Sequence, residues 1–87
     1  LELVGALRKV FAQTTEGLPL SLQFEVKGLE RPLPAAKSME LLRIAREAVT
    51  NTAVHADARK LEVSLAFEPD RVLFVARDDG KGFEPNL

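Results

Sequence analysis

The sequence predicts a small α/β domain of the α+β type, whose elements follow the order helix, strand, helix, strand, strand. Two observations predict this class. Apolar residues recur every three or four positions in two segments, as in amphipathic helices, and elsewhere they alternate with polar residues, as in half-buried strands. The length of 87 residues permits one domain with a modest core.

The first helix is predicted over residues 1–15, because its apolar side chains share one helical face. Gly17 and Pro19 end this helix, since glycine caps a helix C-terminus and proline cannot continue it. A strand is predicted over residues 20–27, where apolar and polar side chains alternate. A loop begins at Gly28.

A second, longer helix is predicted over about residues 34–56, and two strands follow it as a hairpin. Residues 60–67 alternate between apolar and polar, which predicts a half-buried strand. Residues 72–76 are almost all apolar, which predicts a central strand covered on both faces. The Pro-Asp pair at residues 69–70 provides the turn between these strands.

Composition and charge exclude several classes of function. Twelve Lys and Arg against 13 Asp and Glu leave no basic surplus for nucleic acid. The absence of cysteine and the single histidine exclude disulfides, thiolate catalysis, cysteine-based zinc sites and multi-histidine metal sites. No apolar run approaches the ~20 residues that cross a bilayer, so we expect a cytoplasmic chain. Because the sequence starts at Leu1 without a methionine, we expect a piece of a longer protein or a processed product. Whether that parent is membrane-anchored stays open.

Three chemically active side chains follow one another on the second predicted helix. Glu47, Asn51 and His55 are spaced four residues apart, which places them within roughly 80° of one another. They adjoin the apolar face, so they are predicted to line a cavity, with Arg43 and Arg46 assigned to the opposite, solvent side. A purely structural alternative is that Glu47 pairs with one of these arginines and that Asn51 satisfies a loop carbonyl.

A second constellation follows the last predicted strand, where residues 77–83 read R-D-D-G-K-G-F. Glycines allow positive φ and let a ligand approach the backbone closely. A carboxylate fixed at such a junction can accept a hydrogen bond from an amino group. The structural alternative is an ordinary acidic turn, because Asp and Gly dominate turns.

Together, the two segments resemble the ATP-binding domain of bacterial sensor histidine kinases. The resemblance is carried by R-E-A-V-T-N-T-A-V-H-A-D-A at residues 46–58 and V-A-R-D-D-G-K-G-F at residues 75–83. The first segment is similar to kinases paired with NarL-type response regulators, within the HATPase or GHKL superfamily of gyrase, MutL and heat-shock chaperone ATPases. The resemblance implies a truncated two-layer Bergerat-type ATP-binding fold. Residues 1–87 would hold the N-box and first glycine box, without the ATP lid and second glycine box.

The resemblance also implies roles on the helix. Glu47 matches the catalytic acid of the N-box, which orients or activates the attacking group. Asn51 matches the residue that binds ATP and holds Mg²⁺, a cation that prefers oxygen ligands. His55 matches a histidine near the phosphates and not the phosphorylated histidine, which lies in a separate dimerisation domain. Val54 departs from the pattern, because relatives usually carry Arg or Lys there.

Asp78 matches the aspartate that accepts a hydrogen bond from the adenine amine. Gly80 and Gly82 match the glycines that let the backbone pass close to ATP. Asp79 matches the D-D-G-K-G-F pattern of the family, and no separate role is assigned to it.

The implied activity of the parent is that of an ATP-dependent protein-histidine kinase. It would use Mg²⁺ and ATP to phosphorylate a histidine on its own dimerisation domain and then pass the phosphoryl group to a response regulator in a two-component system. The alternatives are a truncated, non-catalytic fragment that acts only through protein contacts, or a relative of the anti-sigma serine kinases. We expect the 87 residues alone to bind ATP weakly, and to self-associate through an exposed sheet edge.

Overall fold

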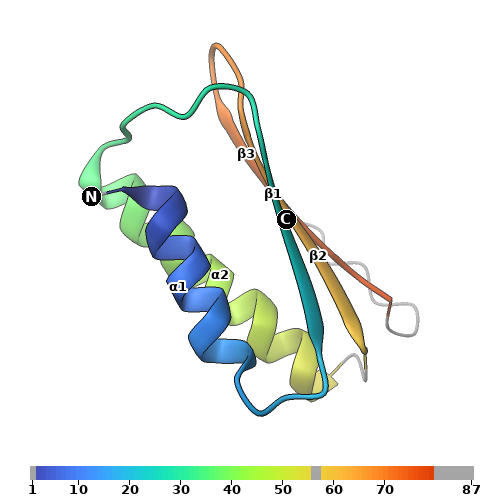
Figure 1. Cartoon of the computed structure of the whole chain (residues 1–87). Coiled ribbons are helices and arrows are strands. Elements are labelled where there is room, and N and C mark those ends of the chain that lie inside the picture. The colour runs from blue at the N-terminus through green and yellow to red at the C-terminus, as the bar shows by residue number, and fades with distance from the viewer. Residues whose placement is uncertain (1, 56–57, 80–87) are drawn as a thin grey trace.

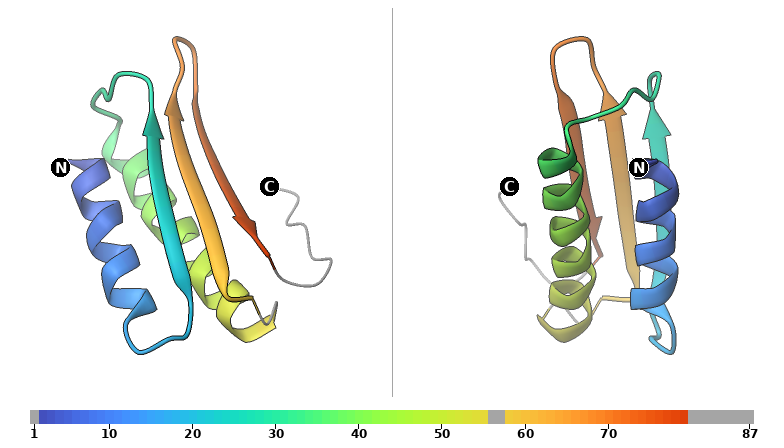
Figure 2. Two further views of the ribbon diagram at one scale, coloured as in Figure 1. Left: turned by 45° about the vertical axis from the view of Figure 1, so that its right-hand side comes forward. Right: turned by 90° about the vertical axis from the view of Figure 1, so that its left-hand side faces the viewer.

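The computed structural model describes residues 2–55 and 58–79 and confirms the α+β class and the predicted order of elements. The five elements are α1 (Leu3–Thr15), β1 (Ser21–Lys27), α2 (Ala35–His55), β2 (Lys60–Phe67) and β3 (Val72–Asp78). Both helices lie on the same face of the three-stranded sheet, which makes a two-layer arrangement (Figures 1 and 2). Neither helix of the described chain is long and apolar enough to span a membrane.

The sheet is mixed, with the strand order β1-β2-β3. β1 runs parallel to β2, from Ser21 opposite Lys60 to Lys27 opposite Ala66. Neighbouring parallel strands need a crossover connection, and α2 provides it. β2 and β3 form an antiparallel hairpin, in which Leu61 pairs with Asp78 at the open end.

The core lies between the two helices and the sheet. Ten of its buried apolar side chains come from three elements: Leu3, Leu7, Val10 and Phe11 on α1, Ala45 and Val49 on α2, and Leu61, Val63, Leu65 and Phe67 on β2. Side chains of β1 and β3 on the same face pack against this cluster and are half-buried. The periodicity that predicted the helices and strands therefore also selected the buried positions.

The prediction of a central, doubly covered strand at residues 72–76 is wrong. β3 lies at an edge of the described sheet, and its residues alternate between half-buried and exposed. Leu73 and Val75 point to the uncovered face and are 40% and 37% exposed. The central strand is β2, because it pairs with both β1 and β3. Among the described residues no second layer covers the face of the sheet opposite the helices.

Two glycines mark the ends of elements. Gly17 follows α1 with a φ of 76°, and the N–H of Leu18 donates to the carbonyl of Thr15 at 3.0 Å, which confirms the predicted end of this helix. Gly28 follows β1 with a φ of 80°. A Cβ at Gly28 would lie only 2.4 Å from the carbonyl oxygen of Phe67, so the chain passes too close to β2 there for any side chain.

Candidate functional site

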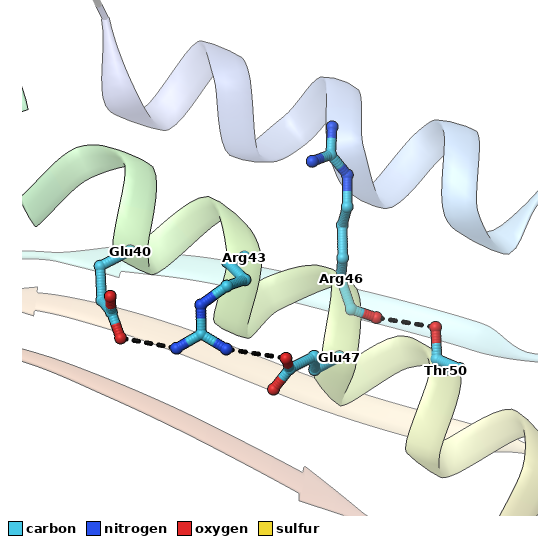
Figure 3. A network of polar contacts seen from close by, with 5 residues as sticks. All are labelled: Glu40, Arg43, Arg46, Glu47 and Thr50. Carbon is cyan, nitrogen blue, oxygen red and sulfur yellow. Dashed lines mark hydrogen bonds and ion pairs between the residues drawn. The ribbon is translucent and has the colours of Figure 1, made fainter. Parts of the chain in front are cut away.

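Glu47 lies on the flank of α2 that faces away from α1. Arg43 donates to the Oε1 atoms of Glu40 and Glu47, each at 2.7 Å, while Arg46 extends toward α1 (Figure 3). The side chains of Arg43 and Glu47 are 56% and 59% exposed, so Glu47 does not line a cavity beside the core as predicted. Arg43 lies next to Glu47 and not on the opposite side, because residues four apart share a helix face. The Glu47–Arg43 ion pair that was the structural alternative is thus formed.

The charges around Arg43 favour its protonated form. The hydrogen bond to Glu40, followed by the charges of Glu40 and Glu47, raises the pKa of the Arg43 guanidinium. Glu40, Arg43 and Glu47 form a row of alternating charge along the exposed flank of α2. Thr50 continues the same helix surface, where its hydroxyl donates to the carbonyl of Arg46 at 3.0 Å.

Asn51 lies one turn beyond Glu47 and is also exposed. Its neighbour Thr52 is 5% exposed and points into the molecule, so the carboxamide of Asn51 stands outside the core. His55 is the last residue of α2, and its side chain lies outside the described part of the chain. Val54, which departs from the pattern expected from the resemblance, is 67% exposed.

Asp78 ends β3 and is half-buried. Because side chains alternate along a strand, Asp78 shares the face of Phe74 and Ala76, which pack against the core beneath the helices. β2 begins shortly after α2 ends, and its first residues pair with the end of β3. The last turns of α2, which carry Asn51, and the end of β3 at Asp78 thus lie at the same end of the molecule, as the course of the two elements in Figure 1 shows.

Asp79 makes contacts that the sequence analysis did not anticipate. Its Oδ1 accepts hydrogen bonds from the backbone N–H groups of Arg59 at 3.0 Å and Lys60 at 2.9 Å. Its own N–H donates to the carbonyl of Lys60 at 3.2 Å. The hydrogen bond from Lys60 N–H lowers the pKa of this carboxyl group, with a smaller contribution from Arg59. The hairpin register was the signal that could have placed Asp79 opposite the start of β2.

The described residues form a shallow hollow at this end and a larger one at the other. The smaller hollow has a volume of about 190 Å³ and is lined by Lys60, Glu62, Arg77, Asp78 and Asp79. Lys60, Glu62 and Arg77 are exposed on the face of the sheet away from the helices, so this hollow does not connect Asp78 with α2. A hollow of about 500 Å³ lies at the opposite end, where Val72 begins β3 and Leu41 belongs to the first half of α2. Gly80 and Gly82, which were predicted to lie close to the nucleotide, are outside the described residues.

No protein-family model matches the sequence, but several curated proteins do. The signal transduction histidine-protein kinase/phosphatase DegS of Bacillus subtilis (strain 168) is 31% identical over 97% of this chain and 23% of its own length. The sensor histidine kinase MctS of Rhizobium johnstonii is 31% identical over 97% of the chain and 18% of its own length. The nitrate/nitrite sensor protein NarX of Escherichia coli (strain K12) is 31% identical over 80% and 11%. The homologues are therefore sensor histidine kinases, and the chain spans less than a quarter of the length of each.

Proposed function

We propose that residues 1–87 form the first part of the ATP-binding domain of a sensor histidine kinase, with a Bergerat-type fold. One observation carries the proposal: the described parts of the two segments that resemble this domain meet at one end of the molecule, where α2 presents Asn51 and β3 ends at Asp78. The similarity to sensor histidine kinases also supports this proposal. The parent would be a longer protein with a cytoplasmic kinase region.

The adenine end of the nucleotide is assigned to Asp78. This carboxylate is half-buried at the end of a strand that the core holds in place. A carboxylate accepts hydrogen bonds only, so it matches the exocyclic amine of adenine. The backbone at Gly80 and Gly82 would pass close to the nucleotide, because glycine has no side chain to prevent the approach.

The phosphate end is assigned to the last turns of α2. Asn51 presents an exposed carboxamide oxygen, and this fits Mg²⁺, which takes few protein ligands and keeps several waters and phosphate oxygens. Bound Mg²⁺ would neutralise charge on the triphosphate. His55 would lie near the phosphates and would not be the residue that is phosphorylated.

Glu47 is proposed to orient the group that attacks the γ-phosphate. In the structure Arg43 donates to its carboxylate at 2.7 Å. Exposed pairs of this kind contribute roughly 0.2–1 kcal/mol, so substrate can replace the contact at little cost. The phosphoryl group would go to a histidine of the dimerisation domain and then to a response regulator, with catalysis resting on positioning and charge neutralisation.

Replacement of Asn51 tests the assignment in the full-length parent kinase. Asn51→Ala should abolish autophosphorylation, measured by transfer of labelled γ-phosphate, because the oxygen ligand for Mg²⁺ is removed. The free energy of unfolding should change by less than about 0.5 kcal/mol, since the side chain is exposed.

Gln13→Ala is the matched control, because it removes an exposed carboxamide from α1 instead. It should leave autophosphorylation at the wild-type rate. Full activity of the Asn51 variant would show that the metal assignment is wrong.

A further inference from the structure

The carboxylate of Asp79 connects two segments that meet only in the folded chain. Its Oδ1 accepts hydrogen bonds from the backbone N–H groups of Arg59 at 3.0 Å and Lys60 at 2.9 Å. Its own N–H donates to the carbonyl of Lys60 at 3.2 Å. These three hydrogen bonds lie one residue beyond Leu61–Asp78, the last pair of the β2–β3 ladder. We refer to them as the Asp79 clamp.

The clamp acts at a point where a strand would otherwise fray. Terminal pairs of a ladder open more readily than internal ones, because fewer hydrogen bonds and contacts hold them. Asp78 belongs to such a terminal pair. Arg59 belongs to the short connection between α2 and β2, and Lys60 is the first residue of β2, so the clamp also ties the end of β3 to the segment that follows α2.

We propose that Asp79 is a positioning residue for nucleotide selection, an inference that rests on the proposed function. By holding the end of β3 against Arg59 and Lys60, it fixes the Asp78 carboxylate relative to α2. Adenine presents an amino group that can donate a hydrogen bond to Asp78, whereas guanine presents a carbonyl oxygen, an acceptor, at the corresponding position. A fixed carboxylate rejects guanine, while a carboxylate that can move away from the carbonyl oxygen discriminates less.

The contribution of Asp79 is one of geometry and not of charge at the base. The carboxylate is occupied by two backbone donors, so it points toward the connection before β2. An asparagine at this position keeps an acceptor oxygen of the same reach, whereas an alanine has none. This difference separates positioning from a general effect of the negative charge.

The experiment compares Asp79→Ala and Asp79→Asn in the full-length parent kinase. Dissociation constants for Mg²⁺-ATP and Mg²⁺-GTP are measured by calorimetry, and hydrogen exchange of the peptide containing Arg59 and Lys60 is measured by mass spectrometry without nucleotide. Asp79→Ala should lower the preference for ATP over GTP about tenfold, as expected for the loss of one well-placed hydrogen bond, and should speed exchange at both amides. Asp79→Asn should retain both properties. Asp70→Ala, an exposed carboxylate at the opposite end of the hairpin, should change neither.

Three results would overturn the proposal. Equal weakening of ATP and GTP binding by Asp79→Ala would show a structural role only. Unchanged exchange at Arg59 and Lys60 would show that the clamp is absent, and an Asn variant that behaves like the Ala variant would show that charge matters and not the acceptor. Asp78→Ala distinguishes these results from failure of the proposed function. If this variant keeps the preference for ATP over GTP, the assignment of Asp78 to the adenine site is wrong, and the proposed role of Asp79 is then wrong as well.

Discussion

Gly28 shows how one residue can be required by its surroundings as well as by its own backbone. Its φ of 80° costs an L-residue roughly 1–2 kcal/mol, and a Cβ would also meet the Phe67 carbonyl oxygen at 2.4 Å. Gly28→Ala should therefore lower the free energy of unfolding by more than about 2 kcal/mol, measured by urea denaturation.

Gly17 offers a matched control for this prediction. Its φ of 76° is similar, but a Cβ there would have no heavy atom within 4 Å. Gly17→Ala should cost only the conformational part, roughly 1–2 kcal/mol. Equal losses in the two variants would contradict the role assigned to the contact with β2.

Asp79 should make stability depend on acid pH. The pKa of its carboxyl group is lowered in the folded state by the N–H groups of Lys60 and Arg59, so the folded chain binds this proton less readily than the unfolded chain. The stabilisation is therefore complete above the unfolded pKa of about 3.9 and is lost as the pH falls through that value to the folded pKa. In urea denaturation between pH 7 and pH 3, Asp79→Asn should lose less stability on acidification than wild type. Parallel pH profiles would contradict this.

At the scale of elements, periodicity predicted which segments become helices and strands, because it reports which side of a segment is apolar. It did not predict which strand becomes central. Residues 72–76 are apolar on both faces, yet β3 lies at the edge of the described sheet, since the position of a strand depends on its partners and not on its own composition. The assignment of Arg43 to the side opposite Glu47 failed for a simpler reason, because residues four apart lie on one helix face.

The central position of β2 gives a testable ranking of its side chains. Leu65 is completely buried, whereas Leu73 on β3 is 40% exposed. Leu65→Ala should cost about 2–5 kcal/mol, because it removes apolar contacts and leaves a cavity in the core. Leu73→Ala should cost less than about 1 kcal/mol. Both changes in the free energy of unfolding can be measured by urea denaturation. A larger loss of stability for Leu73→Ala than for Leu65→Ala would contradict the central position of β2 in the core.

At the scale of the whole molecule, the candidate site was inferred from two motifs that are separated in the sequence. Spacing along one helix could group Glu47 and Asn51, but no local pattern could bring Asp78 to the same end of the molecule. That depends on the crossover from β1 to β2 and on the register of the hairpin. The Asp79 clamp depends on the same register, which is why it was not predicted from residues 77–83 alone.

The described sheet has β1 and β3 at its edges, and edge strands can pair with another chain. We predict that the 87-residue chain self-associates at high concentration, with β3 as the contact because Leu73 and Val75 are exposed there. Light scattering should show a rising mean mass. Val75→Lys should shift the chain toward the monomer, because it adds charge to the edge strand.

Val54→Lys is the control for that experiment, since it adds the same charge at an exposed valine on α2. It should not reduce association. A constant monomer mass for the wild-type chain at all concentrations would contradict the prediction.

The direction in which α2 runs has an electrostatic consequence. A helix carries roughly half a negative charge at its C-terminal end, from aligned peptide dipoles and unpaired carbonyls, and phosphates in proteins usually meet the opposite, positive end. α2 ends at His55, so the proposed phosphate site near Asn51 lies at the negative pole. Free ATP would be repelled there, and the chain has no cationic surplus to offset this. Under the proposed function, the species that binds is thus the magnesium complex, whose metal reverses the local field.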